Sequence, residues 1–118
     1  MALITLFLHK VTLYLAFMKG GGYIYIMTNK NKTTLYVGVT SDLHSRVIRL
    51  NQHYFSRKIS GKYNHGICIY YEYHQNVDRA LARVKQIKEL RREKKEELVN
   101  TMNPAWKDLW GQIIKMTG

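Results

Sequence analysis

The sequence predicts an α+β fold: a small three-stranded, mainly antiparallel sheet flanked by helices. Two short apolar runs, Tyr23–Met27 and Thr34–Val39, lie on either side of a polar segment and predict a β-hairpin. A third strand-like run covers Ile67–Tyr73. Apolar residues then recur every three or four positions through the charged segment Arg79–Asn100, which predicts one long helix.

The hairpin is expected to have a longer loop than a two-residue turn. Its connection, Thr28–Thr33, contains six polar residues and no Asn-Gly or Asp-Gly pair. Side chains alternate between the two faces of a strand, so Tyr23 and Tyr25 should share one face. The predicted hairpin therefore presents phenol groups side by side on a rigid surface.

The segment after the hairpin should form a helix that begins near Leu43. Ser41 and Asp42 are residues that commonly cap a helix N-terminus. Leu43, Val47 and Leu50 follow at helical spacing and predict the buried side, which turns Arg46 and Arg49 toward the hairpin surface or solvent. The polar, glycine-containing stretch 51–65 is expected to be a loop or a short helix.

The end of the chain predicts a capped helix followed by an apolar fold-back. Asn76 or Asp78 can cap the long helix. Its expected buried residues share a spacing of three or four and are Val77, Leu81, Val84, Ile87, Leu90 or Arg91, and Leu98. Pro104 should end the helix. We expect Trp106, Leu109 and Trp110 to return against the sheet.

The chain length of 118 residues, with 46% apolar residues, indicates one globular domain with a modest core. We place the folded unit at residues 23–110, an apolar leader and glycine hinge at residues 1–22, and a C-terminal tail at residues 111–118. His9 and Lys10 divide the leader into halves too short to span a bilayer. Two interpretations stay open: an over-extended reading frame whose natural start is Met18, or a translated segment that packs on the domain. A membrane partner is expected only if residues 1–18 are translated.

The charge of the chain predicts a polyanionic partner. Its 19 basic residues exceed its 8 acidic residues, which gives a net charge of +11 and a pI near 9.9. A nucleic acid is the first candidate, a ribosomal contact the second and an anionic membrane surface the third. The single cysteine, Cys68, excludes an internal disulfide and a cysteine-based zinc site and is expected to be buried, which fits a reducing cytoplasm.

Two tripeptides carry the most specific signal in the chain. They are Tyr23-Ile24-Tyr25 and Tyr36-Val37-Gly38, and Arg46 follows ten residues after Tyr36. In this arrangement the chain resembles the GIY-YIG nuclease superfamily, in particular its small single-domain bacterial members. Further similar segments are Leu35–Thr40, Asp42-Leu43, Lys62–Asn64, Tyr70–Glu72, Ala82-Arg83, Lys85–Lys88 and Asn103–Leu109.

The resemblance implies a GIY-YIG fold and a metal-dependent endonuclease that hydrolyses phosphodiester bonds in DNA. It also implies branched or damaged DNA as the partner and DNA repair as the process in which the protein acts. It implies catalytic positions for Tyr25, Tyr36 and Arg46. One tyrosine would help to activate water, the other would position the phosphate, and the arginine would stabilise the developing charge. A glutamate on the long helix would hold one Mg²⁺ or Mn²⁺ ion.

The chain departs from the family pattern at the metal ligand. The helix segment of the family reads Ala-Arg-Glu-Lys-Gln-Ile-Lys, whereas here Val84 stands at the glutamate position. Valine cannot coordinate a hard cation, which needs oxygen ligands. Glu89 is expected on another side of the helix, and Glu72 is a substitute to consider. Leu50 also replaces a histidine usual in the family, for which His44 or His53 could compensate. The resemblance therefore implies an impaired nuclease with no complete metal site.

Basic residues surround the expected site in sequence and predict a surface that follows a phosphate backbone. They are Lys30, Lys32, Arg49, Arg57, Lys58 and Lys62. Two other functions remain open. One is a nucleic-acid-binding module without enzymatic activity, which could bind RNA as well as DNA. The other is a basic ribosome-associated protein.

Overall fold

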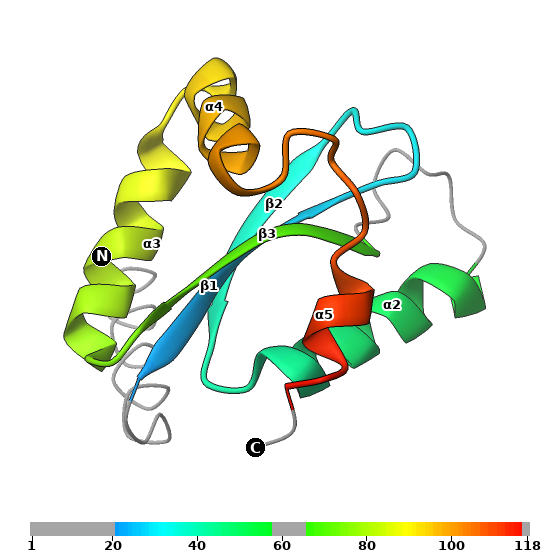
Figure 1. The fold of residues 1–118 in the computed structure, drawn as a ribbon, viewed down its shortest axis with the longest axis horizontal. Coiled ribbons are helices and arrows are strands. Elements are labelled where there is room, and N and C mark those ends of the chain that lie inside the picture. The colour runs from blue at the N-terminus through cyan, green and yellow to red at the C-terminus, as the bar shows by residue number, and fades with distance from the viewer. Residues whose placement is uncertain (1–20, 58–65, 117–118) are drawn as a thin grey trace, which may run out of the picture.

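The computed structural model describes residues 21–57 and 66–116 of the chain (Figure 1). In chain order the elements are β1 (Gly22–Thr28), β2 (Leu35–Thr40), α2 (Leu43–Arg57), β3 (Ile67–His74), α3 (Val77–Glu89), α4 (Arg92–Met102) and α5 (Trp110–Ile113). The predicted α+β class is confirmed, since the three strands form one sheet with helices around it.

The sheet has the strand order β2-β1-β3, and both neighbours of β1 run antiparallel to it. The predicted hairpin is confirmed: Tyr25 lies opposite Gly38, and Tyr23 lies opposite Thr40. On its other side β1 pairs Tyr23 with Tyr73, and the register shifts between Ile26 and Met27. The central position of β1 gives it hydrogen-bonded neighbours along both edges.

The two faces of the sheet carry separate apolar cores. Ile24 and Ile26 of β1 belong to a cluster that includes buried residues of α3 and α4. Tyr25 and Met27, which alternate with them, belong to a second cluster that includes residues of α2 and α5. Figure 1 shows α3 and α4 on one side of the strands and α2 with α5 on the other. The sheet therefore separates residues of α3 from those of α2.

Helix α2 begins where the sequence predicts, because Asp42 caps it. The carboxylate accepts hydrogen bonds from the backbone N–H of Ser45 at 3.1 Å and from its hydroxyl at 2.7 Å. Leu43 and Val47 are buried and Leu50 is partly buried in the second cluster, as expected. The helix continues to Arg57, so of the two interpretations for the stretch from residue 51 the helical one holds for this part, as an extension of α2.

The single long helix predicted over Arg79–Asn100 was wrong, because the structure contains two helices. Asn76 caps α3, one of the two residues expected to do so. Leu90 and Arg91 then take extended backbone angles, with ψ of 144° and 157°. A continuous helix would extend roughly 33 Å in one direction. The break instead redirects α4, so that Val99 packs in the same core as α3.

The helix α4 also contacts the hairpin loop. Arg92 donates hydrogen bonds to the carbonyl oxygens of Thr33, at 2.6 Å, and Lys32, at 3.0 Å. These bonds join the start of α4 to the connection between β1 and β2. They fix the direction that the chain takes after Arg91.

The buried side of α3 is shifted from the predicted stripe. Ala80, Val84 and Ile87 are buried, whereas Leu81 is only partly buried. The small Ala80 allows the helix to approach the sheet closely, and the larger Leu81 lies at the margin of the contact. Val84 and Ile87 were correctly assigned to the core.

The segment after α4 returns to the sheet as expected. Asn103 ends α4, and its side chain donates to the carbonyl oxygen of Ile69 at 3.0 Å and accepts from the backbone N–H of Lys107 at 3.0 Å. The backbone N–H of Leu109 donates to the carbonyl oxygen of Cys68 at 2.8 Å. Ile113 of α5 has no exposed surface and packs in the second cluster. The core thus continues into the segment where the sequence suggested a tail.

The start of the described chain is part of the sheet. Gly22, expected in a hinge, pairs with His74 at the beginning of β1. The leader up to residue 20 lies outside the described residues. Within residues 21–57 and 66–116, no helix combines the length and apolar character needed to cross a membrane.

Candidate functional site

The side chains of Tyr25 and Arg46 meet on the face of the sheet covered by α2. Arg46 donates from Nε to the hydroxyl oxygen of Tyr25 at 3.0 Å. Tyr25 is 1% exposed, and Arg46 is partly buried. A buried tyrosine on the central strand thereby holds the guanidinium of the neighbouring helix in a fixed position.

Gly38 provides the space for this contact. A Cβ atom at position 38 would collide with the hydroxyl and ring of Tyr25. Gly38 is the strand partner of Tyr25, so the absence of its side chain lets the phenol extend across β2 toward α2. The glycine of the second tripeptide therefore has a direct steric reason.

Tyr36 completes the group formed with Tyr25 and Arg46, which we call the Tyr25–Arg46 site. The rings of Tyr25 and Tyr36 have centroids 6.2 Å apart and an interplanar angle of 39°. Hydrogen bonding to Tyr25 raises the pKa of Arg46, and contact with Tyr36 contributes in the same direction. Arg46 is therefore a cation at neutral pH. Tyr36 is 39% exposed, so the site opens to solvent on its side.

The basic residues expected around this site are placed in part. Lys30 and Lys32 are exposed in the loop between β1 and β2, beyond Tyr36 along the sheet. Arg49 is exposed on α2, one turn after Arg46. Lys58 and Lys62 lie outside the described residues, and the side chain of Arg57 is not described. The described basic residues thus extend from the Tyr25–Arg46 site in two directions.

Val84 lies in the hydrophobic core and away from the Tyr25–Arg46 site. It is 7% exposed and packs in the cluster that contains Ile24 and Ile87. That cluster occupies the opposite face of the sheet from Tyr25. Its apolar neighbours supply no oxygen ligand for a divalent cation.

Glu72, the substitute considered for a metal ligand, is engaged elsewhere. Its carboxylate accepts a hydrogen bond from Nε of Arg83 at 2.7 Å and lies 3.7 Å from Nε2 of His74. That second distance is too long for a hydrogen bond, and the buried Nε2 atom of His74 has no hydrogen-bond partner among the described residues. Burial and the charge of Glu72 raise the pKa of the adjacent Tyr70. Glu72 pairs with Ile24 in register and so points away from the face that carries Tyr25.

The residues present do not fit the divalent metal that the family resemblance implies. Among the described residues, no group of three or more His, Cys, Asp and Glu side chains could hold a metal ion. His44, considered as a compensating polar group, stacks on Trp110 with ring centroids 6.0 Å apart. The side chain of His53 is not described.

Cys68 has no catalytic environment. Burial raises the pKa of its thiol to about 12, so the reactive thiolate is not formed near neutral pH. The side chain packs in the second cluster beside Met27. The prediction that Cys68 is buried is confirmed.

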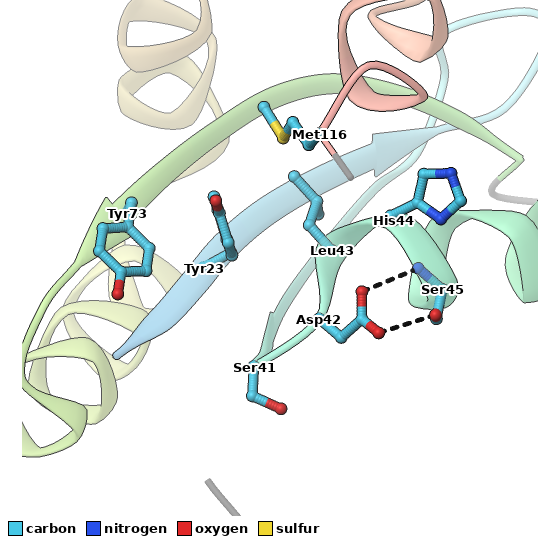
Figure 2. A pocket seen from close by; sticks show the side chains of 8 residues that line it. All are labelled: Tyr23, Ser41, Asp42, Leu43, His44, Ser45, Tyr73 and Met116. Atoms are coloured by element: carbon cyan, nitrogen blue, oxygen red, sulfur yellow. Dashed lines mark hydrogen bonds between the residues drawn. The ribbon is translucent and has the colours of Figure 1, made fainter. Parts of the chain in front are cut away.

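A cavity of about 640 Å³ lies on the same face of the sheet as the Tyr25–Arg46 site, and the sequence alone did not predict it. Its lining residues are Tyr23, Ser41, Asp42, Leu43, His44, Ser45, Tyr73 and Met116. Figure 2 shows Tyr23 and Tyr73 on the strand side and the segment from Ser41 to Ser45 on the opposite side. We call it the Tyr23–Tyr73 cavity. The alternation of Tyr71 and Tyr73 along β3 was the signal that could have indicated an aromatic surface here.

Comparison with known proteins identifies a family. The GIY-YIG catalytic domain matches residues 21–97 of this chain. No curated protein is significantly similar to it in sequence. The chain is similar to the solution NMR structure of the UPF0213 protein BH0048 from Bacillus halodurans, with 22% sequence identity and a TM-score of 0.48. That similarity covers 75% of this chain and 92% of the Bacillus protein.

Proposed function

This chain belongs to the GIY-YIG family, and from that premise we propose that it binds DNA, with one backbone phosphate held at the Tyr25–Arg46 site. The observation that carries the proposal is the 3.0 Å hydrogen bond from Arg46 to Tyr25. It orients a permanent cation on a surface reached through the partly exposed Tyr36. The net charge of +11 provides a long-range attraction for a polyanion.

The chemistry of the guanidinium supports phosphate as the bound group. Its planar fork of N–H donors matches two phosphate oxygens, and such bonds are strengthened by the charge on both partners. The hydroxyl of Tyr36 is in reach of the same ligand, because Tyr36 lies beside Tyr25. Lys30, Lys32 and Arg49 are proposed to contact neighbouring phosphates, and Lys58 and Lys62 remain sequence-based candidates for the same role.

We assign this chain a weak or absent metal-dependent cleavage activity. The tyrosines and the arginine expected for hydrolysis are present, whereas Val84 occupies the position of the metal-binding glutamate and packs among apolar residues. Glu72 is paired with Arg83 on the other face of the sheet. We therefore propose a GIY-YIG domain that retains phosphate recognition and lacks the glutamate that would bind its metal. A buried, reduced Cys68 fits a reducing cytoplasm, where we expect the protein to act.

Binding is tested with the full chain and Arg46→Gln on duplex, nicked and branched DNA. Arg46→Gln should weaken binding to each DNA about tenfold or more, because a charge-assisted contact is lost. Arg79→Gln is the matched control, since Arg79 is exposed on α3 and away from the site. Equal losses in both variants would mean that only total charge matters and that the site has no special role. Competition with RNA of the same length distinguishes a DNA-binding protein from a ribosome-associated one, because the latter should prefer RNA.

Cleavage is tested on nicked and branched DNA with Mg²⁺ or Mn²⁺. The full chain should show little or no product, and no more than a mixture that contains EDTA. Metal-dependent cutting that requires Tyr25 and Arg46 would overturn the assignment of impaired activity. In that case the Glu72→Gln variant would be examined next.

A further inference from the structure

We propose that the Tyr23–Tyr73 cavity receives an unpaired nucleobase of the DNA strand whose phosphate lies at the Tyr25–Arg46 site. This inference rests on the proposed function and specifies its substrate: DNA with a single-stranded or extruded nucleotide. The bases of an intact duplex are stacked and cannot enter a cavity of this kind.

The strand side of the cavity is an aromatic surface. The ring centroids of Tyr23 and Tyr73 lie 4.8 Å apart, and those of Tyr23 and Tyr71 lie 6.5 Å apart. Tyr73 is 52% exposed, although it is a large aromatic side chain on a strand. Gly21 lies so close that an added Cβ atom would collide with the ring of Tyr73, so the backbone supports that ring. A fixed and exposed tyrosine provides the flat surface on which a base of any sequence can stack.

The opposite side of the cavity supplies polar groups that suit a base. Both carboxylate oxygens of Asp42 accept hydrogen bonds from Ser45, which fixes their orientation at the rim. A carboxylate oxygen has further capacity to accept, and bases carry N–H donors on their pairing edges. A volume of about 640 Å³ lies within the range of small-molecule sites and exceeds the space needed for one base.

Charge distinguishes the two neighbouring sites. A phosphate beside the carboxylate of Asp42 would be repelled, whereas an uncharged base would not. The guanidinium of Arg46 offers the complementary position for the phosphate. The two sites are adjacent, because Tyr23 and Tyr25 point to the same face two residues apart, about 7 Å along the strand. Arg46 likewise follows the lining residue Ser45 directly on α2. One nucleotide can therefore place its base in the cavity and a flanking phosphate at Arg46.

The experiment uses the full chain and two single-stranded oligonucleotides of equal length. One carries 2-aminopurine at its central positions, and the other has an abasic tract there. Stacking on tyrosine should quench the 2-aminopurine fluorescence on binding. Tyr73→Ala should weaken binding of the first oligonucleotide about five- to tenfold, remove the quenching and leave the abasic oligonucleotide unaffected. Tyr73→Phe retains the ring and should behave as the wild type.

Matched variants separate this inference from the proposed function. Met102→Ala removes an exposed apolar side chain from α4, away from the cavity, and should change neither affinity. Arg46→Gln should weaken both oligonucleotides alike, because each retains its phosphates. If Tyr73→Ala matches Met102→Ala on both oligonucleotides, the inference is overturned while DNA binding at Arg46 stands. If Arg46→Gln binds both as well as the wild type, the proposed function fails, and the cavity loses its neighbouring phosphate site.

Discussion

Tyr25 lies across its strand partner Gly38, in space that no other residue type would leave open. This contact explains how a buried phenol on the central strand reaches a guanidinium on α2. The two tripeptides that define the family therefore act together, one by providing the hydroxyl and the other by leaving room for it.

Gly38→Ala should displace the ring of Tyr25 and separate it from Arg46. We expect a loss of about 1–3 kcal/mol in the free energy of unfolding, typical of overpacking in a core, together with weaker DNA binding. Gly111→Ala is the control, because an added Cβ atom there meets no atom of the described residues within 4 Å. Urea denaturation and a DNA titration of both variants give the comparison. Similar behaviour of the two alanine variants would contradict the steric role of Gly38.

Tyr25→Phe keeps the ring and removes the oxygen that accepts from Arg46. The free energy of unfolding should fall by about 1 kcal/mol, the net value of a hydrogen bond, and DNA affinity should fall several-fold because Arg46 loses its orientation. Tyr71→Phe makes the same chemical change at a hydroxyl that bonds to Gln112. Tyr71→Phe should lower the free energy of unfolding by no more than Tyr25→Phe does, and it should leave DNA affinity unchanged. Equal DNA affinities for the two phenylalanine variants would argue against an orienting role for Tyr25.

Asp42 should stabilise the fold in a pH-dependent way. Hydrogen bonds from the hydroxyl and then from the backbone N–H of Ser45 lower the pKa of Asp42 in the folded state. Its contribution is therefore complete above the unfolded pKa of about 3.9 and is lost as the pH falls through the lower folded value. Asp42→Ala should cost about 1 kcal/mol at pH 7, as helix caps do, and progressively less below about pH 4. A pH-independent difference in urea midpoints between the variant and the wild type would refute this account.

Val84→Glu should destabilise the fold, because it places a carboxylate among apolar side chains. Burial raises the pKa of such a group, so the loss should be larger at pH 7 than at pH 4.5, where the carboxyl is protonated in the folded state. We expect a loss of about 2–4 kcal/mol at pH 7. Val84→Gln is the uncharged control, and its loss should not change over this range. A Val84→Glu protein as stable as the wild type that binds Mn²⁺ by calorimetry would show that this position can reach a metal site.

Arg49 should contribute to the salt dependence of DNA binding. If it contacts one phosphate, Arg49→Gln should reduce the slope of log K against log salt by about 0.9 for duplex DNA. Arg79→Gln, on the other side of the sheet, should leave the slope unchanged. Titrations at several salt concentrations measure both slopes. An unchanged slope for Arg49→Gln would remove Arg49 from the proposed interface.

Local signals in the sequence were sufficient for the hairpin and for the cap at Asp42. Each depends on residues close in sequence or on strand alternation. The end of α3 was missed because neither Leu90 nor Arg91 breaks a helix by its own chemistry. That break depends on partners that are distant in sequence. Arg92 donates hydrogen bonds to the carbonyl oxygens of Thr33 and Lys32, and Val99 packs in the core that also contains α3.

The candidate site was predictable to a similar depth. The family resemblance pointed to Tyr25, Tyr36 and Arg46 as one site, and the structure brings these side chains together. Val84 was correctly expected to pack in the core. The Tyr23–Tyr73 cavity was missed because its two sides come from strands and a helix start whose separation depends on tertiary packing. The pairing of Glu72 with Arg83, which weighs against Glu72 as a metal ligand, depends on tertiary contacts and could not be read from the sequence.

The position of α5 has a consequence for protein synthesis. Leu109 and Ile113 pack in the same apolar cluster as Tyr25. A nascent chain that has reached only Met102 has all three strands but lacks this cover, so Met27 and Cys68 present apolar surface. Exposed apolar surface makes a partly folded chain prone to aggregation, so we expect the docking of α5 to be the step that completes this core.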